Sequence, residues 1–167
     1  VWLGAGTTCD DCCTVVVPPG ANLENEPEDC WNSSVFNGGC DNLPDHPPQF
    51  SAIGALPYTV YGESWAGDGM RDTDWYEIVL VEPAQIAWTV NAEFAPQAFI
   101  VAAGYCDPND PNACKLAEAS GEPCVDVVAI ATVAPGTYWL VVAPAAGKPA
   151  QCQADCLITH GGYLRSL

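Results

Sequence analysis

Ten cysteines are the residues of this chain with the most distinctive chemistry. They are Cys9, Cys12, Cys13, Cys30, Cys40, Cys106, Cys114, Cys124, Cys152 and Cys156. A high and even number of cysteines is typical of disulfide bonds made in an oxidising compartment. The C-x-x-C-C run at 9–13 leaves zinc as an alternative. Zinc sites usually add a second cysteine pair or histidine, however, and His46 and His160 both lie far along the sequence from the C-x-x-C-C run.

The cysteines fall into two groups along the chain. Five precede residue 41 and five follow residue 105. If every thiol is paired, the odd number in each group requires at least one bridge between the groups, within one chain or between subunits. A local bridge between Cys30 and Cys40 is also predicted, because the W-N-S-S-V-F-N-G-G segment between them can turn back.

Carboxylates are the second group of side chains with distinctive chemistry. The chain has 21 Asp and Glu against four Lys and Arg, for a net charge of -17. Such a surface repels nucleic acid and anionic membranes, so neither is expected as a partner. Cations are the natural partners, either calcium or basic proteins. The alternative is that the acidity only keeps the protein soluble.

The sequence lacks the motifs of common enzymes, and we predict no enzymatic activity. It contains no G-x-S-x-G, and His46 stands in D-H-P-P, which is typical of a solvated loop. Oxidised cysteines cannot act as nucleophiles. Paired carboxylates for glycoside hydrolysis remain an alternative, because many acidic pairs exist and none stands out.

The elements that position these residues are predicted to be short strands, rich in β-branched and aromatic residues and bounded by turn formers. The predicted strands are Tyr58–Tyr61, Trp75–Val81, Gln85–Val90, Ala98–Ala102, Val125–Val133, Thr137–Ala143 and Leu157–Leu164. Little helix is expected, apart from one turn at Lys115–Ala119 in the loop from Cys106 to Pro123. The A-P-G-T segment at 134–137 predicts a hairpin turn.

Two of these strands carry a pattern that predicts their surroundings. In Trp75–Val81, Glu77 should face water, which directs Tyr76, Ile78 and Leu80 to the core and Trp75, Val79 and Val81 outward. Strand Thr137–Ala143 is apolar on both faces. It is therefore predicted to be a central strand covered on both sides, or a strand with one face against a partner.

The chain is predicted to be a secreted protein with two parts. Residues 1–29 read as an N-terminal arm and acidic linker, and residues 30–167 as a β-sandwich domain. No apolar segment approaches the roughly 20 residues of a membrane span. The sequence starts at Val1 without a basic leader, as expected of a mature protein whose signal peptide has been removed. We therefore expect it outside the cell or on the cell surface.

Several segments together resemble a known family. These are E-N-E-P-E-D at 24–29, D-T-D-W-Y-E-I-V-L at 72–80, A-P-G-T-Y-W-L-V-V at 134–142 and G-G-Y-L at 161–164. They look like the bacterial pre-peptidase C-terminal domain, which follows many secreted proteases and collagenases. The resemblance spans about residues 24–165, and N-G-G-C at 37–40 is similar to cysteine-rich versions. It implies a jelly-roll-like antiparallel β-sandwich.

The resemblance also implies a calcium site between the linker and the sandwich. The positions that correspond are Glu24, Glu26, Asp29, Asp72 and Asp74. Calcium takes six to eight hard oxygen ligands, which clustered carboxylates supply. Arg71 occupies a position where that family has Asp, so a salt bridge from Arg71 could instead neutralise the cluster. The D-P-N-D-P-N loop at 107–112 is a further oxygen-rich candidate.

Two functions follow as hypotheses. The first is an extracellular structural subunit that assembles with copies of itself into a filament, sheath or matrix, through the apolar residues Val1, Trp2 and Leu3 of the arm. The second is an accessory binding module, as the resemblance implies, which holds an extracellular protein or polysaccharide. Its surplus of Trp and Tyr could stack on such a ligand.

Overall fold

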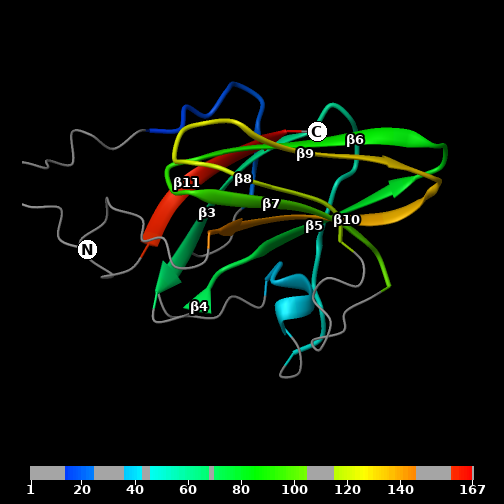
Figure 1. The fold of residues 1–167 in the computed structure, drawn as a ribbon, viewed down its shortest axis with the longest axis horizontal. Coiled ribbons are helices and arrows are strands. Elements are labelled where there is room, and N and C mark those ends of the chain that lie inside the picture. Colours follow the sequence, from blue (N-terminus) through cyan, green and yellow to red (C-terminus); the bar gives the residue numbers. More distant parts are fainter. Residues whose placement is uncertain are drawn as a thin grey trace, which may run out of the picture.

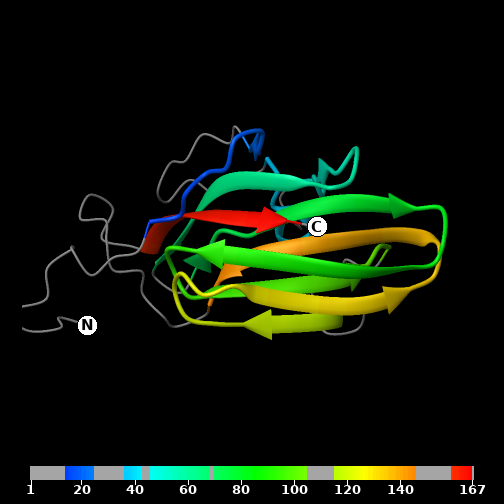
Figure 2. The same cartoon turned by 90° about the horizontal axis from the view of Figure 1, so that it is seen from above.

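A computed structural model of the chain describes residues 14–24, 36–42, 46–67, 70–104, 115–145 and 159–166. Its strands form two sheets that face each other as two layers (Figures 1 and 2). The first sheet contains β1 (Asn22–Leu23), β3 (Thr59–Gly67), β11 (Thr159–Ser166), β6 (Ala84–Ala92) and β9 (Val127–Val133) in this order, with β4 (Met70–Arg71) paired to β3. The second contains β2 (Ser51–Ala52), β5 (Asp74–Leu80), β10 (Gly136–Pro144), β7 (Pro96–Ala102) and β8 (Lys115–Ser120).

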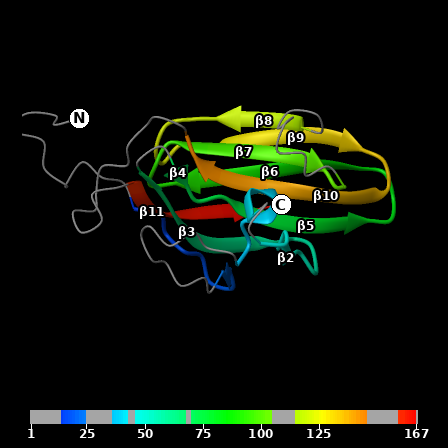
Figure 3. The same cartoon turned by 90° about the horizontal axis from the view of Figure 1, so that it is seen from below.

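The order of the strands is that of a jelly roll. Eight described strands are six residues or longer, and their orders are β3-β11-β6-β9 and β5-β10-β7-β8. Consecutive strands cross between the sheets at most steps, as in a double-sheet jelly roll. All pairs among these eight strands are antiparallel. The predicted all-β sandwich is therefore confirmed, and Figure 3 shows β3 and β11 towards one side of it and β8 and β9 on the other.

Two local predictions were wrong, both because of tertiary pairing. Residues Lys115–Ala119 form strand β8 rather than a helical turn, since β7 provides a partner along them. Helix propensity is a weak preference that such pairing overrides. The A-P-G-T segment does not close a hairpin, because β9 pairs with β6 while β10 pairs with β5 and β7. The segment instead carries the chain from one sheet to the other.

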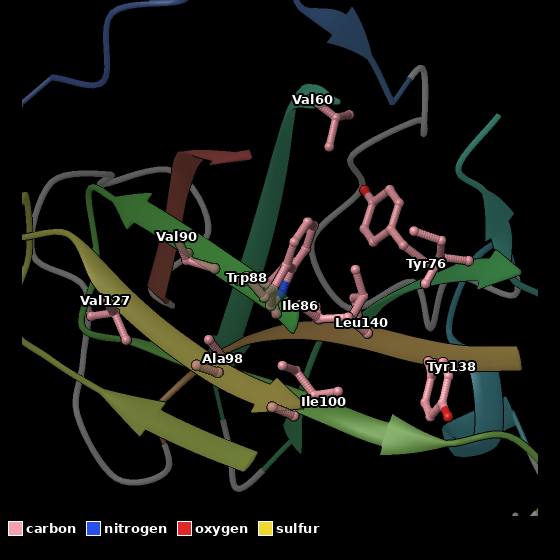
Figure 4. Packing of buried hydrophobic residues seen from close by; sticks show 14 of the residues in the cluster. Val60, Tyr76, Ile86, Trp88, Val90, Ala98, Ile100, Val127, Tyr138 and Leu140 are labelled. Carbon is pink, nitrogen blue, oxygen red and sulfur yellow. The ribbon is translucent and has the colours of Figure 1, made fainter. Parts of the chain in front are cut away.

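The core lies between the two sheets and is apolar. Tyr76 and Ile78 of β5 face inward as predicted, and Val79 is exposed on the outer face. Trp88 of β6 is fully buried, and its indole N–H donates to the carbonyl of Val141 on β10 at 3.1 Å. This hydrogen bond joins the sheets directly. Figure 4 shows Trp88 near the centre of the buried cluster and Tyr76 towards one side of it.

Strand β10 is buried on both faces, as the first of its two predicted interpretations requires. Trp139, on the outer face of the second sheet, is 6% exposed. Phe50 stacks on its ring at 4.5 Å between centroids, and Trp75 meets both rings edge-on. The chain around the 3-10 turn Gly39–Asn42 passes close to Trp75, since a Cβ on Gly39 would lie 2.2 Å from its ring. The outer aromatic residues are thus covered by the protein itself.

Part of the predicted arm and linker packs on the sandwich. Leu23 of β1 pairs with Tyr61 of β3, and the Val15 amide donates to Glu93 Oε1 at 2.9 Å. The segment appears in blue beside β3 in Figure 2. The predicted assembly residues Val1, Trp2 and Leu3 lie outside the described residues, so this prediction and the domain boundary at residue 29 stay predictions.

Disulfide bonds are present where cysteines are described. Cys40 and Cys124, the two cysteines in the described ranges, are both disulfide-bonded. The wider prediction that all ten cysteines are oxidised, and that Cys30 pairs with Cys40, stays a prediction. In the ranges that the structure describes, no helix is long and apolar enough to cross a membrane.

Candidate metal centre

Buried polar side chains gather in a few neighbouring places of the described chain. They come from the segment around the 3-10 turn, from the residues where β5 begins, and from β3. They are Asn37, Asn42, Ser64, Asp72, Thr73 and Asp74. Because burying a polar group is costly unless it is bonded or coordinated, this concentration marks a candidate site. We use "polar cluster" for Glu24, Asn37, Ser64, Asp72, Asp74 and Tyr76.

Strands β3 and β5 position the two aspartates. The Asp72 amide donates to the carbonyl of Trp65 at 2.8 Å, and its own carbonyl accepts from Ser64 Oγ at 3.3 Å. Asp74 is the first residue of β5 and stands opposite Val142 of β10. It shares the inward face of β5 with Tyr76 and is 0% exposed. Both aspartates are therefore held by backbone pairing in the interior of the sandwich.

Asn37 lies across from the start of β5 and is also 0% exposed. Its carbonyl accepts from the Trp75 amide at 2.9 Å, and its side-chain Nδ2 donates to Glu24 Oε1 at 2.6 Å. The side-chain Oδ1 is buried and has no hydrogen-bond partner among the described residues. An amide oxygen of this kind is a good ligand for a hard cation.

Glu24 brings the N-terminal segment to the polar cluster. Its amide donates to the carbonyl of Tyr61 at 3.0 Å, one residue beyond the end of β1. Its carboxylate accepts from Asn37 and from the hydroxyl of Tyr76. In Figure 4 the Tyr76 ring extends from β5 towards Val60 of β3. The carboxylate therefore connects the N-terminal segment to the interior of the sandwich.

Within the described ranges, Arg71 forms hydrogen bonds with neutral partners rather than an ion pair with an aspartate or glutamate. Its guanidinium donates to Gln97 Oε1 and, at 3.1 Å, to the carbonyl of Pro144. Lys115 and Glu118 form the ion pair of the described chain, and both belong to β8. Because Glu26 and Asp29 lie outside the described residues, the alternative in which Arg71 neutralises the cluster stays a prediction.

The structure describes part of the predicted ligand set. Glu24, Asp72 and Asp74 are described and belong to the polar cluster, whereas Glu26, Asp29 and the D-P-N-D-P-N loop lie outside the described residues. No group of three acidic, histidine or cysteine side chains in the described ranges could hold a metal ion by itself. A complete calcium shell needs six to eight oxygens. The described part supplies carboxylates from Glu24 and Asp74 and the amide oxygen of Asn37.

Sequence reasoning did not identify Asn37 as a site residue. Its signal was the N-G-G-C segment, which contributed to the resemblance and is otherwise typical of a turn. Ser64 and Tyr76 were also not predicted at the site. Tyr76 was assigned to the core, and it is buried there, but its hydroxyl reaches Glu24.

Further carboxylates lie along the N-terminal segment and make this region electronegative. Burial raises the pKa of the Tyr61 phenol, and the nearby carboxylates of Glu63 and Glu93 raise it further. Burial and the negative charge of the carboxylates both stabilise the protonated phenol relative to its anion. Tyr61 thus stays neutral at physiological pH, and the negative potential around it favours a cation.

The chain was compared with protein families, curated proteins and solved structures. No family model matches the chain, and no curated protein matches it. The chain is similar to the pre-peptidase C-terminal domain of a collagenase from Bacillus anthracis, with 20% identity and a TM-score of 0.48. The match covers 72% of this chain and 96% of that chain. It is the class of domain that the sequence resembles. The jelly-roll sandwich itself is established by the strand pairing described above.

Proposed function

We propose that the chain is a non-catalytic extracellular accessory module whose N-terminal segment is fixed to the β-sandwich by a calcium ion. The observation that carries this proposal is the contact of Glu24 with Asn37 and Tyr76, since Tyr76 shares one face of β5 with the fully buried Asp74. A cation bound there would link residues from three separate segments. The segment that precedes the sandwich would then take a defined direction only when calcium is present.

Calcium suits the chemistry of this site. The available ligands are hard oxygens, from carboxylates and an amide, and the described ranges have no histidine or cysteine among the buried polar residues. Zinc prefers nitrogen and sulfur, whereas calcium prefers oxygen in an adaptable geometry. The disulfide bonds at Cys40 and Cys124 support an oxidising compartment. Calcium sites of extracellular modules bind with dissociation constants of roughly 0.1–1 mM.

A protein is a better candidate ligand for the module than a polysaccharide. The tryptophans in the part of the chain that the structure describes are covered: Trp65, Trp88 and Trp139 are buried, and Trp75 is half-buried under the chain around Gly39. Sugar binding by stacking requires an exposed aromatic face. The net charge of -17 favours a basic partner.

Self-assembly through Val1, Trp2 and Leu3 is the second candidate function. Burial of side chains of this size is worth about 1.5–3 kcal/mol each, and a neighbouring subunit could provide the burial. Deletion of residues 1–6 should leave a folded protein that does not polymerise. Polymers formed by the deletion variant would exclude the arm as the connector.

Hydrogen exchange with and without calcium tests the main proposal. Calcium should slow exchange of the Glu24 and Trp75 amides, which are bonded to Tyr61 and Asn37, more than that of amides between β6 and β9. The comparison within one protein controls for global stabilisation. Equal slowing of exchange in both regions would argue against a calcium site at the polar cluster. The same conclusion would follow if exchange rates were identical in calcium and in chelator.

A further inference from the structure

The edges of the two sheets differ in how they are protected against pairing with another strand. An exposed edge has unpaired N–H and C=O groups, and proteins protect it by short strands, charges or bulges. β1 and β2 are two residues long. β8 carries Lys115 and Glu118 and has a register shift near Ile100 of β7. The remaining edge strand, β9, has none of these features.

β9 is long, regular and uncharged. Its seven residues, V-V-A-I-A-T-V, pair with β6 without a register shift. No described residue forms a backbone hydrogen bond with its other side. Val128 and Ile130 point away from the core and are 41% and 54% exposed. The residues that alternate with them face inward and are buried, namely Val127, Ala129, Ala131 and Val133. This is the pattern of a strand ready to receive a partner.

The sheet surface beside β9 is also uncharged. Ile130 stands opposite Ala87 of β6, Val128 opposite Thr89, and the exposed Thr132 opposite Gln85. Asp126, at the end of this surface, accepts a hydrogen bond from Asn91 at 2.7 Å. In a chain with 21 acidic residues, such a surface can meet another acidic protein without facing like charges.

We propose that β9 pairs antiparallel with β9 of a second copy, about a two-fold axis at Ile130. In this register Ile130 faces Ile130, and Val128 faces Thr132 on the outer surface. On the inner surface Ala129 faces Ala131, which continues the apolar core across the interface. A two-fold contact uses the same surface on both copies and closes as a dimer. The partner is a second copy because this register places an apolar residue or threonine opposite every residue of β9.

The dimer should respond to salt in a characteristic way. Each copy carries a net charge of -17, so the copies repel each other at distances beyond the contact. At 0.1 M ionic strength, the repulsion between exposed charges more than about 10 Å apart is largely screened. Association through an uncharged strand should therefore become stronger as salt is added, whereas a contact held by ion pairs would weaken.

Sedimentation velocity of the full chain, at protein concentrations up to about 1 mM, tests the proposal. The test uses two variants that place opposite charges at residue 130. Ile130→Lys places like charges at the axis and should weaken dimerisation by about a hundredfold or more. Ile130→Glu should do the same. A mixture of the two variants should restore a dimer with one copy of each, because opposite charges then face each other across the axis.

Val79→Lys is the matched control, since Val79 is 64% exposed on the outer face of the other sheet. It should dimerise like the parent, and all variants should melt as folded proteins. The proposal is overturned if the parent is a monomer throughout the concentration range, or if Ile130→Lys dimerises normally. It is also overturned if the mixed variants stay monomeric, or if removal of residues 1–6 abolishes the dimer while Ile130→Lys does not.

Discussion

The interior of the sandwich has two parts of opposite character, and β5 contributes to both. Ile78 and Tyr76 pack in the apolar core with Trp88, whereas Asp74, on the same face of the same strand, lies in the polar cluster. Apolar burial stabilises the fold without any ligand. Buried carboxylates stabilise it only when their charge is compensated. If calcium binds as we propose, the core folds by itself, whereas the position of the N-terminal segment depends on the cation.

The largest effect is expected in the core. Trp88→Ala removes a fully buried ring and the hydrogen bond to Val141, and should destabilise the protein by about 3–5 kcal/mol. Urea denaturation should give the same loss with calcium and with chelator. The exposed Val79→Ala should change stability by less than about 0.5 kcal/mol. A loss from Trp88→Ala that depends on calcium would break the distinction between the two parts.

Gly39→Ala should be the next largest change. Gly39 has a φ of 50°, and a Cβ there would lie 2.2 Å from the Trp75 ring. The backbone conformation alone costs about 1–2 kcal/mol for an L-residue, and displacement of the ring adds about 1–3 kcal/mol. Because the same segment carries Asn37, calcium affinity should also fall. Gly104→Ala shares a positive φ but meets nothing within 4 Å, so it should show only the backbone effect. Similar losses for both variants would contradict this account.

Asp74→Asn separates the charge of the polar cluster from its shape. In chelator the variant should melt at the same temperature as the parent or higher, because it keeps the size of the side chain and removes a buried charge that no cation compensates. In calcium at 100 times the dissociation constant, the parent should gain about 2.7 kcal/mol that the variant does not. The control is Glu77→Gln, since Glu77 lies on the outer face of β5 and accepts from Trp139. A calcium-dependent rise in melting temperature that survives Asp74→Asn would place the ion elsewhere.

Tyr76→Phe should have the smallest effect. It keeps the ring in the core and removes the hydroxyl that donates to Glu24, at a cost of about 0.5–1.5 kcal/mol. Thermal melts should show the loss mainly in chelator, because bound calcium would hold Glu24 without the hydroxyl. A larger loss in calcium than in chelator would mean that the hydroxyl supports the ion rather than substitutes for it.

Much of the fold could be predicted from local patterns. The alternation around Glu77 placed Tyr76 and Ile78 inside and Val79 outside, and the two-sided apolar pattern of Thr137–Ala143 indicated a central strand. The segment Lys115–Ser120 could not be predicted in this way. Its alanines and charged residues favour a helix locally, and its conformation is decided by the distant strand β7.

The site was less predictable than the fold. Its acidic residues were inferred from a resemblance, but Asn37 gave only the signal of a turn, and its burial results from the packing of its segment against the start of β5. The role of Arg71 depended on where its long side chain extends, and it reaches Gln97 on β7. The exposed edge at β9 likewise follows from the order of strands in the sheet, which no local pattern contains.

Calorimetric titration of calcium into chelator-treated protein tests the central claim most directly. The account predicts binding of one ion per chain in the parent, with a dissociation constant of about 1 mM or below. Binding should be lost in Asp74→Asn, weakened in Glu24→Gln and unchanged in Glu77→Gln. An absence of calcium binding by the parent at millimolar concentration, or equal binding by Asp74→Asn, would contradict the proposal that calcium fixes the N-terminal segment to the sandwich.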